Sequence, residues 1–153
     1  MIQNDLQLLR VTRENILGLV KGLSLEQLDS IPEGLNNSLI WNIGHVIVTQ
    51  QLLVYKLSGL DPLMPEALIE KYRKGSKPDG ATGTDEWEYL QEAAFSLIEQ
   101  TEADYHAGKF SSYIPYTTSY RVELTSVEQA IGFNNMHESM HLGNMLVMKK
   151  LVG

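Results

Sequence analysis

Apolar residues recur three or four positions apart along four long segments of the chain, which is the spacing of an amphipathic helix. The first predicted helix covers residues 3–22 and ends where Gly22 follows a lysine. The second is expected to begin at Asn37 or Ser38 and to run to residues 58–59. Because this second helix is apolar on both sides, we expect it to be buried on both sides, either in the core or at a subunit contact.

Helix-start patterns mark three further elements. Ser24 and Gln27 have the spacing of a capping box, which predicts a short helical turn. Thr84, followed by two acidic residues, is expected to cap a third long helix that ends near His106. Thr125 opens the sequence Thr-Ser-Val-Glu, which also has the pattern of a capping box. The last helix is predicted to run from there almost to the C-terminus.

The remaining segments are predicted to be long connections. Residues 60–83 are rich in proline and glycine, with room for one turn of helix at 65–72. Residues 108–124 are expected to form a structured loop or a short extended segment, because Pro115 breaks any helix there. The sequence therefore predicts an all-α fold, a four-helix bundle with long connections, in a single domain of residues 1–153.

Composition narrows the class of protein. The chain has 153 residues, 43% of them hydrophobic, and a net charge of −7, which argues against a nucleic-acid or anionic-membrane partner. No apolar run approaches the roughly 18 residues of a membrane span, and residues 1–18 lack the order of a signal peptide. We therefore expect a cytoplasmic protein. The chain has no cysteine, so it cannot supply a disulfide, a thiol nucleophile or a thiolate ligand.

The candidate chemistry lies in the last predicted helix, where residues 137–141 read His-Glu-Ser-Met-His. Positions i and i+4 differ by about 40° around a helix and about 6 Å along it, so His137 and His141 can point at one ion. Two histidines on an inward face are costly to bury unless something satisfies them. Either a hydrogen-bonded core pair or a pair of metal ligands explains them.

A metal site needs at least one more ligand. No His, Asp or Glu follows His141, so the third ligand must lie upstream. His45 is the candidate, because it falls on the face of the second predicted helix that we expect to point inward. With His137 it would complete a three-histidine site between facing helices, with a position left open for water or a substrate. Three imidazoles suit several first-row ions, so these residues alone do not select the metal.

Polar residues flank the predicted site. Glu138 lies at the edge of the histidine face, where it is either the general base of a zincin-like peptidase or a solvated helix residue. Asn42 and Thr49 flank the His45 face, and each either orients an imidazole or is exposed.

Two further groups of residues suggest partners. Tyr113, Tyr116 and Tyr120 precede the last helix, where they either line a pocket over the open metal position or cover the end of the bundle. Arg121 follows them and is a candidate contact for an anion. Leu142 and the residue one turn later, Leu146, lie on an otherwise polar side of the last helix. Apolar residues in that position suggest a partner surface, and we expect a homodimer.

The two histidine-bearing helices resemble the signature helices of the DinB-like superfamily. The resemblance rests on a W-x-x-x-H segment in SLIWNIGHVIVTQQLLVYKLSG and an H-x-x-x-H segment in FNNMHESMHLGNML, and it extends over nearly the whole chain. It implies a four-helix bundle whose histidine triad, here His45, His137 and His141, binds a divalent metal, zinc or nickel. It also implies a thiol-dependent S-transferase or a related metal enzyme, and it points to a homodimer.

Three functions are compatible with these patterns. The first is a metal-dependent enzyme of the thiol-dependent S-transferase or hydrolase type. Because the chain has no cysteine, a low-molecular-weight thiol would have to enter as a cosubstrate and react with a small electrophile. The second is a non-enzymatic metal-binding or stress-response protein. The third is a peptidase with Glu138 as general base, and the absence of a ligand downstream of His141 argues against it.

Overall fold

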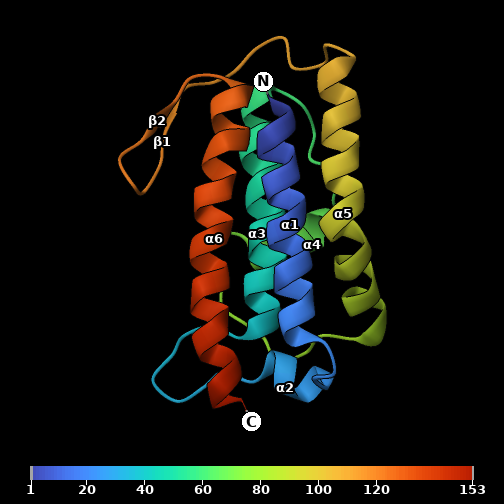
Figure 1. Cartoon of the computed structure of the whole chain (residues 1–153), viewed down its shortest axis with the longest axis vertical. Coiled ribbons are helices and arrows are strands. Elements are labelled where there is room, and N and C mark those ends of the chain that lie inside the picture. The colour runs from blue at the N-terminus through green and yellow to red at the C-terminus, as the bar shows by residue number, and fades with distance from the viewer. Residues whose placement is uncertain (1, 153) are drawn as a thin grey trace.

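Four long helices form the body of the computed structural model, which describes residues 2–152 (Figure 1). These helices are α1 (Ile2–Val20), α3 (Leu39–Val54), α5 (Thr84–His106) and α6 (Val127–Leu151). The connections contain α2 (Leu25–Asp29), the 3-10 turn η1 (Lys56–Ser58), α4 (Glu66–Tyr72), β1 (Tyr116–Thr117) and β2 (Glu123–Leu124). The all-α prediction is confirmed. Figure 1 shows α1 and α6 running in one direction and α3 and α5 in the other.

The helix starts were predicted to within one residue. Ser38 caps α3 by accepting a hydrogen bond from the backbone N–H of Trp41, as one of the two predicted starts requires. The cap of α5 is Gly83 rather than Thr84, which is the first helical residue. The cap of α6 is Ser126, one residue after the predicted position, because its hydroxyl is the one that accepts from the backbone of the first turn.

The segment 108–124 contains a small antiparallel hairpin. β1 and β2 pair with Tyr116 opposite Leu124 and Thr117 opposite Glu123. The turn between the strands includes Arg121, whose φ of 62° is left-handed. Figure 1 shows the hairpin projecting from the bundle beside α6. Of the two alternatives predicted for residues 108–124, the short extended segment is therefore confirmed.

The central helix is α3, in which every residue except Thr49 and Leu52 is buried. The reason is that α5 and α6 pack against it within the bundle and α4 covers it from outside. The prediction that this helix is buried on both sides is confirmed, and its burial lies within the chain. None of the described helices is both long enough and apolar enough to cross a membrane.

A polar layer divides the hydrophobic interior into two clusters. On α1, the buried Arg13 lies between Leu9 of one cluster and Ile16 of the other. On α6, the buried polar residues at 134–141 separate the cluster that contains Ile131 from the one near the C-terminus. Both candidate histidines of α6 belong to this layer.

The contact between α3 and α4 depends on a glycine. A Cβ atom added at Gly44 would lie 2.7 Å from Cδ2 of the buried Tyr72 ring and closer still to two other ring atoms. We expect Gly44→Ala to lower the free energy of unfolding by about 1–3 kcal/mol, because the buried Tyr72 ring would have to shift to make room for the methyl group. Urea denaturation measures the effect.

Gly18 provides the matched control for this substitution. It also lies inside a long helix, but nothing is within 4 Å of an added Cβ. Gly18→Ala should therefore stabilise the protein by about 0.5–1 kcal/mol. If Gly44→Ala stabilised the protein equally, the close contact with Tyr72 would be wrong.

Candidate metal centre

Three histidines from two helices meet in the polar layer. His45 comes from α3, and His137 and His141 come from successive turns of α6. One nitrogen from each ring lies within 4.8 Å of the others. The ring centroids are 4.6 Å apart for the α6 pair and 4.9 and 5.2 Å apart for the pairs that involve His45. The antiparallel packing of α3 on α6 thus assembles the predicted group.

Two of these imidazoles form a hydrogen bond with a residue outside the cluster. Nδ1 of His45 lies 2.8 Å from the carbonyl oxygen of Tyr72, which can only accept, so Nδ1 carries the proton. Nδ1 of His141 lies 2.6 Å from Oδ1 of Asn42, whose amide nitrogen donates to the Ser38 carbonyl. These bonds leave Nε2 of both rings unprotonated, which is the form that binds a metal ion.

The third imidazole lacks such a partner. Nδ1 of His137 is buried and has no hydrogen bond from any described residue. A buried polar atom without a partner costs about 1–3 kcal/mol. Bound to a metal ion, the His137 ring would gain the interaction that the protein does not supply. The donor set therefore fits a divalent ion that accepts imidazole ligands.

The site keeps all three histidines neutral at pH 7. Burial, aided by the neighbouring His141 and His45, lowers the pKa of His137 to about 3. Burial, aided by the charge on His45, lowers the pKa of His141 to about 4. Burial also lowers the pKa of His45, although its hydrogen bond to Tyr72 opposes the shift. Neutral imidazole is the state that a metal ion requires.

The residues predicted to flank His45 have different positions. Asn42 is buried and orients an imidazole, but that imidazole is His141 on the facing helix. Thr49 is half-buried, with Oγ1 3.4 Å from Nε2 of His45. Sequence reasoning missed the aromatic partner of the site, since Trp41 stacks on His45 with ring centroids 4.5 Å apart. The spacing of four residues on one helix was the available signal.

Glu138 points away from the histidines. Its side chain is fully buried, so the alternative of a solvated helix residue is wrong. Arg13 of α1 donates from Nη2 to one carboxylate oxygen at 2.7 Å and from Nε to the other at 3.1 Å. A third bond runs from Arg13 to the carbonyl of Ala94 on α5. The pair therefore joins three helices on the side of α6 that faces α1.

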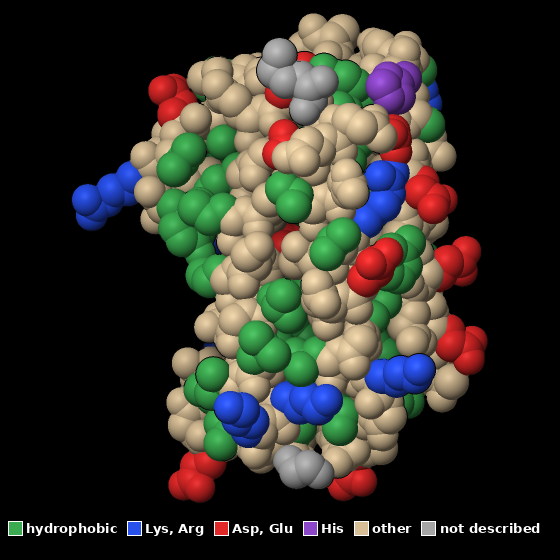
Figure 2. Space-filling view, viewed as in Figure 1, with side chains coloured by type: hydrophobic (Ala, Val, Ile, Leu, Met, Phe, Trp, Pro, Cys, Tyr) green, Lys and Arg blue, Asp and Glu red, His purple; other side chains and the backbone are tan. Residues whose placement is uncertain are grey.

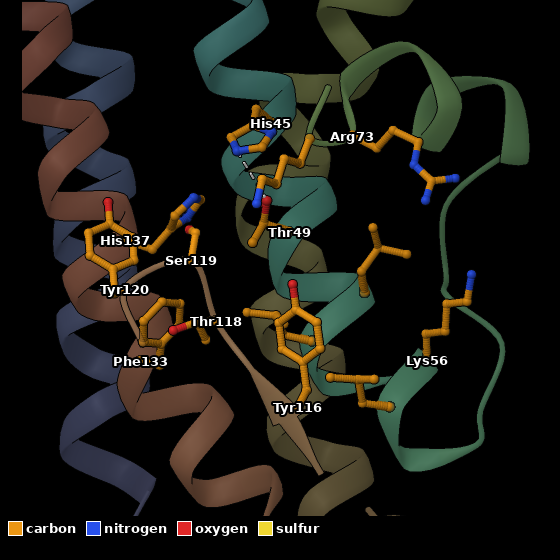
Figure 3. Close-up of a pocket in the computed structure, with 14 residues that line it drawn as sticks. His45, Thr49, Lys56, Arg73, Tyr116, Thr118, Ser119, Tyr120, Phe133 and His137 are labelled. Carbon is orange, nitrogen blue, oxygen red and sulfur yellow. Dashed lines mark hydrogen bonds between the residues drawn. The ribbon is translucent and has the colours of Figure 1, made fainter. Parts of the chain in front are cut away.

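A cavity of about 330 Å³ opens beside His45 and His137 (Figure 3). Tyr116 and Tyr120 of the hairpin segment line it, as one of the predicted alternatives requires. Tyr113 does not line it, because its hydroxyl donates to the Leu53 carbonyl elsewhere. The cavity wall also contains the following residues: Thr49, Leu52, Leu53, Lys56, Leu57, Arg73, Lys74, Thr118, Ser119 and Phe133.

The predicted anion contact, Arg121, lies in the hairpin turn and is not part of the cavity wall. The basic residues of the wall come instead from η1, just after α3, and from the segment after α4. Sequence reasoning missed Arg73 and Lys74 because their position depends on how the connection 60–83 folds back over α3. The cavity gives a small molecule access to two of the three histidines.

Comparison with known proteins agrees with this geometry. The sequence profile of the DinB superfamily matches residues 8–145, from α1 to the last turns of α6, and this range includes all three histidines. The comparison with curated proteins finds no match. Because the profile covers most of the sequence, the chain belongs to the DinB superfamily.

Proposed function

We propose that His45, His137 and His141 hold a divalent metal ion, zinc or nickel, in a metal-dependent enzyme of the thiol-dependent S-transferase or hydrolase type. The observation that carries the proposal is the cluster of three buried, neutral imidazoles at the edge of a cavity. Structural metal sites are closed by protein ligands, whereas catalytic sites keep a position open. Three histidine ligands beside a cavity match the catalytic arrangement.

The chain's own residues define what the site can do. When bound, the metal ion would act as a Lewis acid that stabilises the deprotonated form of a thiol or of water. Tyr72 and Asn42 orient two of the imidazoles and fix their tautomers. Because the chain has no cysteine, a thiol substrate would be a small molecule that enters through the cavity, together with a small electrophile.

The two alternative functions require different features of the structure. A peptidase needs Glu138 as a general base, and Arg13 engages both oxygens of that carboxylate. A non-enzymatic metal-binding or stress-response protein needs no substrate cavity, so the cavity beside His137 favours an enzyme. Metal binding without turnover is the result expected from this second alternative.

Metal analysis and a turnover assay test the proposal. Protein purified without an affinity tag, or reconstituted with zinc or nickel, should contain about one equivalent of metal by plasma mass spectrometry. The loaded protein should then consume a low-molecular-weight thiol in the presence of a chromogenic chloronitrobenzene. Metal without turnover across a panel of thiols would favour the non-enzymatic alternative. An absence of metal after reconstitution would overturn the proposal.

We also propose that the protein is a cytoplasmic homodimer. Its support is a set of exposed apolar side chains on the neighbouring helices α1 and α6, where Leu8, Val11 and Leu146 are 47%, 44% and 50% exposed. Figure 2 shows hydrophobic side chains at several places on this face. Leu142, predicted with Leu146 to form a partner surface, is half-buried and packs against the core.

Light scattering measures the oligomeric state directly. A homodimer should have twice the 17.2 kDa mass of the chain. Leu146→Glu should shift the mass toward that of the monomer, because it places a charge within an apolar contact. Ser96→Glu, at an exposed position of α5 and away from these apolar side chains of α1 and α6, is the comparison variant. A wild-type protein with the mass of one chain would contradict the proposal.

A further inference from the structure

The cavity beside the histidines has an unusual charge for this protein. Lys56, Arg73 and Lys74 are among its lining residues, whereas none of the lining residues is an Asp or Glu. The whole chain is acidic, with 12 basic and 19 acidic residues. Figure 3 shows Lys56 and Arg73 on one side of the cavity, across from His137 and Tyr120. Basic residues therefore gather at this cavity against the trend of the composition.

The cations at the cavity are poorly neutralised. Arg73 pairs with Glu70 at 2.7 Å, but both side chains are exposed, so the pair is weak. Lys56 and Lys74 form no ion pair with any residue in the described range 2–152. Lys71 lies outside the cavity and contacts two carboxylates. Both lysines of the cavity wall are thus left without a counter-charge in the described range.

The rest of the wall sets the shape of the ligand. Leu52, Leu53, Leu57 and Phe133 give the cavity an apolar surface next to the basic residues. A volume of about 330 Å³ suits a small molecule rather than a peptide. A bound divalent ion would add positive charge, because three neutral imidazoles leave its charge uncompensated.

We propose that the cavity binds a small organic anion, with a carboxylate or phosphate group against Lys56, Arg73 and Lys74 and a short apolar body against the leucines and Phe133. The inference rests on the proposed function for its identification of this anion as a substrate, whereas anion binding itself needs only the cavity. Charge-assisted bonds from lysine and arginine recognise both head groups. The thiol or the electrophile of the reaction is therefore an anion.

Matched probes test the charge that the cavity selects. Hexanoate, hexylphosphonate, 1-hexanol and hexylamine share one hydrocarbon chain and differ in the head group. We expect both acids to bind zinc-loaded and metal-free protein, with dissociation constants in the millimolar range for ligands of this size. The alcohol and the amine should bind at least about tenfold more weakly. Chemical-shift titrations of isotope-labelled protein measure the affinities, and the tighter acid identifies the head group.

Lysine substitutions locate the binding site. Lys56→Gln combined with Lys74→Gln should weaken hexanoate binding about tenfold, because the variant removes two of the charges that attract the carboxylate. Lys21→Gln combined with Lys77→Gln is the matched control, because it removes the same two charges from exposed positions that do not line the cavity. An equal loss in the control, or equal affinity for the acid and the alcohol, would overturn the inference.

Failure of the proposed function and failure of the anion-binding inference give different results. If the protein binds no metal but metal-free protein binds hexanoate through Lys56 and Lys74, the proposed function fails and the inference stands. If hexanoate binds only the zinc-loaded protein and the lysine substitutions have no effect, the ion alone attracts the anion. In that case the inference fails and the metal site stands.

Discussion

Replacing Glu138 by glutamine is expected to lower the free energy of unfolding by about 3–5 kcal/mol. The substitution removes the only carboxylate that pairs with Arg13, among the described residues, and leaves a guanidinium that is 1% exposed. A buried charge without its counter-charge keeps the cost of leaving water and loses the attraction that offset it. Urea denaturation of the two proteins at the same pH measures the difference.

Two comparisons separate this effect from a general loss of charge. Glu70→Gln breaks the exposed pair with Arg73 and should change the unfolding free energy by less than about 1 kcal/mol. The double variant Arg13→Met, Glu138→Leu removes both buried charges, so it should recover much of the lost stability. A cost below about 1 kcal/mol for Glu138→Gln would show that the pair is not buried as described.

The same variant distinguishes a structural role from a catalytic one. Glu138 bonds to Arg13 on the α1 side of α6, so its removal should leave metal content unchanged under conditions where the protein remains folded. A peptidase would lose hydrolysis at full metal content and full stability. The stability measurement therefore decides between an ion pair that joins helices and a general base.

The sequence contained a signal for this pair. Position 13 falls on the inward stripe of α1, between Leu9 and Ile16, where an arginine needs a buried partner. Helical spacing places residues on a face, but it does not say which side chain on another helix they will meet. Arg13 and Glu138 are separated by 125 positions, so only the packing of α1 on α6 brings them together. The partner was therefore beyond prediction.

The histidine group, in contrast, was predictable from helical spacing. His137 and His141 are one turn apart, and a fixed helical geometry makes them neighbours in any fold. His45 required one further assumption, that the apolar second helix lies inside, and its burial supports that assumption. Asn42 was expected beside His45 but reaches the facing helix, because its side chain projects across the contact between α3 and α6. Local periodicity determines the face, and tertiary packing determines the partner.

The walls of the cavity were the least predictable part of the site. Only part of the wall comes from α3 and α6, and the rest comes from the connections. Turn residues such as Arg121 adopt conformations that the sequence pattern does not specify. Tyr120 reaches the cavity because its ring packs edge-on against Phe133 of α6. A contact of this kind depends on where the hairpin meets the bundle.

Replacing His45 by alanine is expected to abolish metal binding as completely as His137→Ala or His141→Ala. Each ring supplies one nitrogen to the group, and two imidazoles alone do not complete a site. The loss should exceed the roughly 10–100-fold cost of removing an outer hydrogen-bond partner of a ligand. His106→Ala is the control, because this histidine ends α5 in an exposed position outside the cluster.

The rise in melting temperature on adding zinc is measured for each variant against the same variant without zinc. His45→Ala also removes the donor to the Tyr72 carbonyl, so it will destabilise the protein even without metal. Comparing each variant with and without zinc cancels that loss, because only binding to the folded state adds stability. Wild type and His106→Ala should show the rise, and the three ligand variants should not. If His45→Ala kept it while both α6 variants lost it, the metal would be bound by α6 with some other ligand, and the site between α3 and α6 would be wrong.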